Sequence, residues 1–186
     1  MDIYQFFACL TRLPIRIDSV AGFIKDRGLA DRIYFCEVDI DPDILWAQLK
    51  AHRQKLIYGE EFIEYEIQYS KHLTLPQKRL ACCKELLHIL DDQDAMASTQ
   101  ESVELLIQQM SIPPQSGIAL PAANDHTGII RALLILVPRD CLSEFRRACD
   151  AGDMTADEVA KATGVPVEYA RITLQGFWQQ LVDRIT

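Results

Sequence analysis

The stretch that decides the fold is residues 61–90, which read EFIEYEIQYSKHLTLPQKRLACCKELLHIL. Its first part, Glu61–Tyr69, alternates aromatic or β-branched residues with acids and amides, and this alternation predicts a strand. The polar residues Ser70–His72 predict a turn. Thr74 and Gln77 then stand at the spacing of a capping box, which predicts the start of a helix. The stretch therefore encodes a strand, a turn and a helix in succession.

The predicted helix carries its polar residues in a single stripe. Lys84 and His88 lie one turn apart on the same face, with Glu85 beside them. A helix that is apolar on nearly all other sides is normally buried. In the motif His-Glu-x-x-His, two histidines so spaced bind zinc and the glutamate activates a bound water. Here the window reads Lys-Glu-Leu-Leu-His, so a lysine takes the place of the first ligand.

This layout resembles the ImmA/IrrE-type zincin-like metallopeptidases, in which a strand and a short turn lead into the His-Glu-x-x-His helix. The resemblance begins at Glu64 and continues to Leu174, where Gly164-Val165 is similar to a turn between the family's closing helices. It implies an α+β fold that is mainly helical, with a small β-sheet and C-terminal helices. The first 60 residues contribute nothing to it.

The resemblance also implies a metal site. Glu85 takes the position of the general base and His88 that of the second ligand. Counting back from Pro138 through the apolar end of its helix places Asp125 at the family's third ligand, which is usually a glutamate. Lys84 departs from the pattern, and the motif is therefore degenerate.

A lysine at the first position changes the chemistry that we expect. A protonated ammonium has no lone pair for zinc, and deprotonating a side chain whose pKa is about 10.4 is costly at neutral pH. Nearby acids favour the charged form further. We therefore expect Lys84 to pair with Glu85 or Asp125 and to replace part of the metal's electrostatic role. No cofactor is expected, and zinc only if the protein is active.

Other residues compete for these roles. Glu101 and Glu104 are alternatives to Asp125 as the third ligand. His126 and His72 are alternative metal ligands, although a single histidine in a loop or cap is more often a surface group. His52 is interpreted as surface. The alternative without a functional role is that Lys84 and Glu85 lie on a solvated face of the helix.

The rest of the chain predicts more helices than strands. Arg32–Val38 is the other predicted strand. The predicted helices outside the decisive stretch are Asp2–Arg12, Ser19–Arg27, Asp43–Leu56, Ser98–Met110, a helix capped by Asn124 or Asp125 that runs to Leu136, Asp140–Ala151, Thr155–Gly164 and Pro166–Arg184. We predict a zincin-like domain over residues 1–138 and a C-terminal helical extension over residues 139–186, packed on the same domain.

Composition limits the classes of function. The 186 residues carry a net charge of −8, which disfavours nucleic-acid partners. Asp2 and Arg12 do not fit the pattern of a signal peptide, and no apolar run has membrane-spanning length, so we expect a cytoplasmic protein without a membrane partner. The six cysteines form no Cys-x-x-Cys pair and are expected to be buried in a reducing compartment, with the adjacent Cys82 and Cys83 as an alternative redox site.

Three functional hypotheses follow. The first is a pseudopeptidase that binds a protein partner; the resemblance suggests a transcriptional regulator of a mobile element or stress response. The second is an active zinc metallo-endopeptidase with Glu85 as general base. The third is a helix-turn-helix DNA-binding regulator. It is suggested by the two predicted helices and the intervening glycine turn within Thr155–Leu174, although basic residues do not predominate there.

Overall fold

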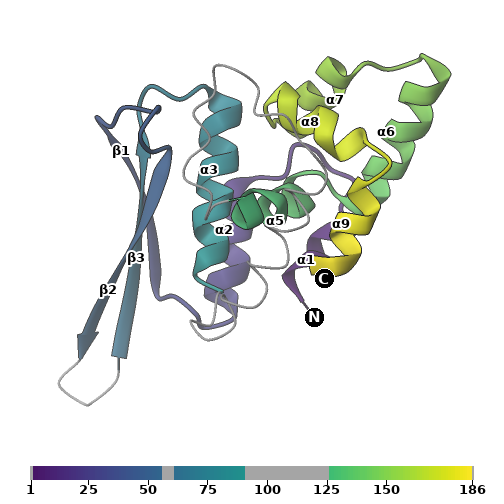
Figure 1. The fold of residues 1–186 in the computed structure, drawn as a ribbon. Coiled ribbons are helices and arrows are strands. Elements are labelled where there is room, and N and C mark those ends of the chain that lie inside the picture. Colours follow the sequence, from purple (N-terminus) through teal and green to yellow (C-terminus); the bar gives the residue numbers. More distant parts are fainter. Residues whose placement is uncertain (1, 56–60, 91–125, 186) are drawn as a thin grey trace.

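A small mixed sheet lies on one side of the molecule and the helices pack on the other (Figure 1). The computed structural model describes residues 2–55, 61–90 and 126–185. The predicted α+β class, mainly helical with a small sheet, is confirmed. The described elements are α1 (Ile3–Ala8), α2 (Ile17–Asp26), β1 (Arg32–Val38), β2 (Ala47–Lys55), β3 (Glu61–Ser70), α3 (Leu75–His88), α5 (His126–Leu136), α6 (Arg139–Ala151), α7 (Ala156–Thr163), α8 (Val167–Leu174) and α9 (Trp178–Ile185).

The predicted strand of the decisive stretch is β3, the centre of the sheet. The strand order is β1-β3-β2, with β1 parallel and β2 antiparallel to β3. Tyr65 and Ile67 are buried in the core, whereas Glu64 and Glu66, between and beside them, are partly exposed. Because side chains alternate along a strand, one face of the sheet packs on the helices and the other is left polar.

Helix α3 lies between the sheet and α5 (Figure 1). It begins at the predicted capping box, where the Thr74 backbone N–H donates to Gln77 Oε1 at 2.9 Å. Every residue from Leu80 to Leu87 is buried. Cys83 faces α5, since its Sγ lies 3.9 Å from the carbonyl oxygen of Ala132. The prediction of a buried helix is confirmed.

The C-terminal helices contribute to the same hydrophobic core. Leu133 of α5 and Trp178 of α9 belong to one cluster of buried residues, so side chains on both sides of residue 139 pack together. Helix α7 has the predicted capping box of Thr155 and Glu158 and ends at Gly164, where the left-handed φ of +68° stops it. The division into ranges 1–138 and 139–186 stays a prediction.

Arg79 connects three distant segments of the chain. Its guanidinium donates to the carbonyl oxygens of Ile15 at 2.6 Å and Gly164 at 3.0 Å, and to that of Thr163 at 3.4 Å. The first acceptor lies just before α2 and the others lie at the end of α7. A single partly buried side chain of α3 thus holds N-terminal and C-terminal segments against the central helix.

The helix predicted over Asp43–Leu56 is wrong. This part of the chain contains β2, whose residues from Ala47 to Lys55 all pair with β3. Alanine, glutamine, leucine and lysine favour a helix locally, but strand formation depends on cross-strand partners that a local pattern does not reveal. The strand follows a turn in which Asp41 Oδ1 accepts the Asp43 backbone N–H at 3.0 Å.

The single helix predicted over Pro166–Arg184 is also wrong, because the chain forms α8 and α9 with Gly176 in the break. Arg146 of α6 stabilises this break. Its Nη2 donates to the carbonyl oxygens of Thr173 at 2.7 Å and Gln175 at 3.0 Å, and so satisfies acceptors at the end of α8. A local reading of the sequence does not include this donor from another helix.

Some predicted bounds differ or fall outside the described residues. The first helix ends at Ala8 rather than Arg12, and the second spans Ile17–Asp26 rather than Ser19–Arg27. The helix predicted over Ser98–Met110 lies outside the described residues, as do the caps Asn124 and Asp125 of the helix that becomes α5.

Candidate functional site

The candidate site is the polar stripe of α3, and its centre is a buried ion pair. Lys84 Nζ lies 2.7 Å from Glu85 Oε1. The Lys84 side chain is 8% exposed and that of Glu85 is 5% exposed. The interpretation of these two residues as a solvated helix face is therefore wrong.

The two partners of the ion pair are consecutive residues of one helix, which is an unusual arrangement. Consecutive residues of an α-helix project about 100° apart and do not face each other. The contact between Lys84 and Glu85 therefore requires both long side chains to curve together over the helix surface. The structure shows one of the two partners that we expected for the lysine, and the other, Asp125, lies outside the described residues.

Burial gives the pair a large energetic role. Two charges removed from water lose hydration, and their attraction offsets that loss only while both are present. Removing one partner of a buried pair typically costs about 3–5 kcal/mol. The apolar neighbours Cys83, Leu86 and Leu87, each 1% exposed or less, exclude water around this part of α3.

The structure describes only part of the metal site that the resemblance implies. His88 is the last residue of α3 and is partly exposed. Asp125 and its competitors Glu101 and Glu104 lie outside the described residues. His126 begins α5, which packs against α3, but its side chain is also outside the described set.

The described donors do not fit a zinc ion. Lys84 offers an ammonium without a lone pair, and Oε1 of Glu85 contacts that ammonium at 2.7 Å. Within residues 2–55, 61–90 and 126–185, no group of three or more histidine, cysteine, aspartate or glutamate side chains is arranged to hold a metal. Of the implied ligand set, only the His88 imidazole is a suitable donor among these residues.

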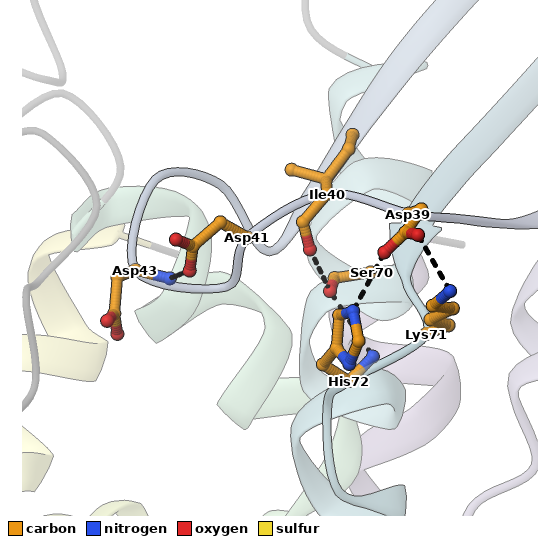
Figure 2. Close-up of polar contacts among 7 residues, drawn as sticks. All are labelled: Asp39, Ile40, Asp41, Asp43, Ser70, Lys71 and His72. Atoms are coloured by element: carbon orange, nitrogen blue, oxygen red, sulfur yellow. Dashed lines mark hydrogen bonds and ion pairs between the residues drawn. The ribbon is translucent and has the colours of Figure 1, made fainter.

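His72, an alternative ligand, belongs to a different cluster at the ends of β1 and β3. Figure 2 shows the carboxylate of Asp39 between the Lys71 ammonium and the His72 imidazole, with Lys71 Nζ at 2.8 Å and His72 Nε2 at 2.8 Å. The buried Ser70 hydroxyl donates to the Ile40 carbonyl oxygen at 2.5 Å beside them. The hydrogen bonds from Lys71 and then His72 lower the pKa of Asp39. This cluster joins two strand ends and was not predicted, because the strand register was unknown.

His52 lies on the exposed part of β2 rather than on a helix. Its Nε2 is 3.5 Å from Glu66 Oε2 on the neighbouring strand, and its side chain is 52% exposed. The interpretation as a surface residue is confirmed, although the predicted helix around it is wrong.

The adjacent thiols of α3 are poorly suited to redox chemistry. Desolvation, followed by the neighbouring charge of Glu85, raises the pKa of Cys82 to about 12. Complete burial also raises the pKa of Cys83. A reactive cysteine needs a lowered pKa and access to solvent. None of the six cysteines is in a disulfide.

The segment considered as a helix-turn-helix forms α7 and α8. Its exposed charges do not make a basic face, because Arg171 pairs with Asp157 at 3.7 Å and Glu158 and Lys161 lie close by on α7. Tyr169 is buried in the core instead of facing outward. These features favour a helix pair packed on its own protein.

Comparisons of the chain with protein-family models, with curated proteins and with solved structures found no match. No helix among the described residues has the length and apolar character needed to cross a bilayer.

Proposed function

We propose that the protein is a catalytically inactive, zincin-like protein-binding module, a pseudopeptidase in which an ion pair replaces the metal. The observation that carries this proposal is the 2.7 Å contact between Lys84 Nζ and Glu85 Oε1 inside the core. It engages the residue that would act as general base with the residue that stands in place of the first ligand.

The arrangement opposes hydrolysis at two steps. A metallopeptidase needs an open coordination position for water, and the ammonium supplies none. The general base must also take a proton from that water, which requires a carboxylate within hydrogen-bond reach of it. Glu85 is 5% exposed and is bound to Lys84. Both features support a scaffold that is kept for binding.

The partner we propose is a protein, and in particular a transcriptional regulator of a mobile element or stress response. This identity comes from the resemblance to the ImmA/IrrE-type family, whose members commonly act on or beside helix-turn-helix repressors. We place the protein in the cytoplasm, where such a regulator acts. Six cysteines without a disulfide are compatible with a reducing compartment.

Zinc content and peptide cleavage test the proposal together. Untagged protein is dialysed against excess zinc, desalted and analysed by elemental mass spectrometry, and a peptide library is assayed for cleavage. We expect less than stoichiometric zinc and no cleavage. The proposal is overturned if one zinc per chain is retained and lost in His88→Ala, or if cleavage occurs and disappears in Glu85→Gln.

Lys84→His restores the motif His-Glu-x-x-His and tests the role of the lysine. We expect this variant to bind more zinc than the wild type. Lys78→His on the same helix is the matched control. It adds an imidazole at a more exposed position, where Lys78 contacts Glu37, and leaves the pair of Lys84 and Glu85 unchanged. Equal zinc uptake by the two variants would show that Lys84 does not stand at a ligand position.

A further inference from the structure

Strand β2 forms one edge of the sheet. Since the strand order is β1-β3-β2, one side of β2 bonds to β3 and no other described strand covers its opposite side. All six residues from Lys50 to Lys55 are exposed. An exposed edge presents unpaired backbone N–H and C=O groups, onto which another extended chain can add as a strand.

The exposed part of β2 is basic although the protein is acidic. The strand Ala47–Lys55 carries Lys50, His52, Arg53 and Lys55 and no acidic residue, whereas the whole chain has a net charge of −8. His52 Nε2 lies 3.5 Å from Glu66 Oε2 of β3. No ion pair joins Arg53 or Lys55 to an acid in the part of the chain that the structure describes. On the neighbouring strand, Glu66 lies opposite Lys50, Glu64 opposite His52 and Glu61 opposite Lys55, whereas Ile63 lies opposite Arg53. The positive charge that no acid pairs with in the described residues is therefore that of Arg53 and Lys55 at the end of the strand.

The basic residues occupy both faces of a projecting arm. Side chains alternate along a strand, so Lys50 and His52 project from one face and Arg53 and Lys55 from the other. In Figure 1 the ends of β2 and β3 that hold Lys55 and Glu61 extend beyond the helices. An extended peptide pairing with β2 would thus have cations on both sides of its own backbone.

We propose that the outer edge of β2, from Lys50 to Lys55, binds an extended acidic segment of the protein partner by strand addition. Backbone hydrogen bonds would supply alignment, and acidic side chains of the partner would meet Arg53 and Lys55. This inference names the chemistry of the partner and in that respect rests on the proposed function. A nucleic acid fits less well, because it offers no peptide backbone for strand pairing.

A selection of random decapeptides against the full 186-residue protein tests the proposed chemistry. We expect the selected sequences to be enriched in aspartate and glutamate. A synthetic peptide from the selection should bind Arg53→Glu/Lys55→Glu about tenfold more weakly than the wild type. The control Lys25→Glu/Arg147→Glu makes the same change in net charge at exposed positions of α2 and α6 and should stay within about twofold.

Backbone methylation of the selected peptide tests strand addition without altering the protein. A strand that adds to an edge uses the N–H groups of alternate residues only. N-methylation of one alternate set should abolish binding, and methylation of the other set should leave it nearly unchanged. Equal effects of the two sets, no enrichment in acids, or equal losses in the two charge-reversed proteins would each overturn the proposal.

Two further measurements distinguish strand addition at β2 from nucleic-acid binding and from the proposed lack of peptidase activity. If a single-stranded oligonucleotide displaces the peptide and also loses affinity in Arg53→Glu/Lys55→Glu, the arm is a nucleic-acid surface and the proposal fails. Mass spectrometry of the bound peptide reports on the proposed function instead. An intact peptide supports an inactive module, whereas a cleaved one overturns inactivity and leaves docking at β2 standing.

Discussion

Arg79 Nε donates a hydrogen bond to the carbonyl oxygen of Gly164 at 3.0 Å and joins the helix of the ion pair to the end of α7. The two residues also touch closely: a β-carbon on Gly164 would lie 2.7 Å from Arg79 Nε and 3.3 Å from the Pro14 side chain. Glycine is therefore required at this position for two reasons, its φ of +68° and the lack of space.

Replacing Gly164 by alanine should destabilise the protein more than the same change at Gly152. Both glycines have a left-handed φ, which costs an alanine roughly 1–2 kcal/mol. Nothing lies within 4 Å of a β-carbon on Gly152, so Gly152→Ala should show only that cost. Gly164→Ala should lose about 2–4 kcal/mol because Arg79 must also move. Urea unfolding followed by circular dichroism measures both values.

Arg79→Ala tests the other side of this contact. It removes the donor to three carbonyl groups and should by itself cost about 2–3 kcal/mol. In the double variant Arg79→Ala/Gly164→Ala the clash with the guanidinium is gone. The double variant should therefore lose less free energy of unfolding than the sum of the losses of the two single variants. Strict additivity would show that the two side chains are not coupled in this way.

The parts of the fold that were predictable are those encoded by neighbouring residues. The capping box of Thr74 and Gln77 and the stop at Gly164 depend on contacts within a few positions, and both are present. Strand β2 and the break near Gly176 depend on partners elsewhere, namely β3 and Arg146. No local pattern contains that information, and both segments were wrongly predicted as continuous helix.

The candidate site divides in the same way. The spacing of Lys84, Glu85 and His88 placed them on one helical stripe, and apolar neighbours indicated burial. The choice of Glu85 as the partner of Lys84 needed the side-chain geometry. The cluster of Asp39 with Lys71 and His72 needed the parallel register of β1 with β3, which sets Val38 opposite Ser70.

The cysteines of α3 should resist alkylation in the native protein. With a pKa of about 12, only a very small fraction of Cys82 is thiolate at pH 8, and its side chain is buried. Iodoacetamide should therefore label the exposed Cys9 quickly and leave Cys82 and Cys83 unlabelled until urea is added. Peptide mapping by mass spectrometry distinguishes the sites. Rapid native labelling of Cys82 would revive a redox role for the adjacent pair.

Acid should weaken the connection between β1 and β3. Hydrogen bonds from Lys71 and His72 hold the pKa of Asp39 below its usual value of about 3.9. A carboxylate with a lowered folded-state pKa adds stability above the unfolded-state pKa, and this stability is lost as the pH falls through the folded-state pKa. The free energy of unfolding should thus decrease below about pH 4, and Asp39→Asn should make the decrease shallower.

The control for this acid effect is Asp153→Asn, which alters an exposed carboxylate outside the sheet. Chemical denaturation at a series of pH values between 2 and 7 provides the comparison. If Asp39→Asn and Asp153→Asn gave the same profile, the contacts of Asp39 with Lys71 and His72 would have no measurable role in folding.

Removing one charge of the ion pair on α3 should lower the free energy of unfolding much more than removing both charges together. Lys84→Met removes the ammonium that lies 2.7 Å from the buried Glu85 carboxylate, and Glu85→Gln removes the charge of that carboxylate, so each should cost about 3–5 kcal/mol. The double variant Lys84→Met/Glu85→Gln removes both charges and should lie much closer to the wild type, because the cost of burying them disappears as well. Urea unfolding of the four proteins gives the coupling energy directly. Single losses below about 1 kcal/mol, the range of exposed pairs, would mean that Lys84 and Glu85 are solvated in solution and that no buried pair replaces the metal.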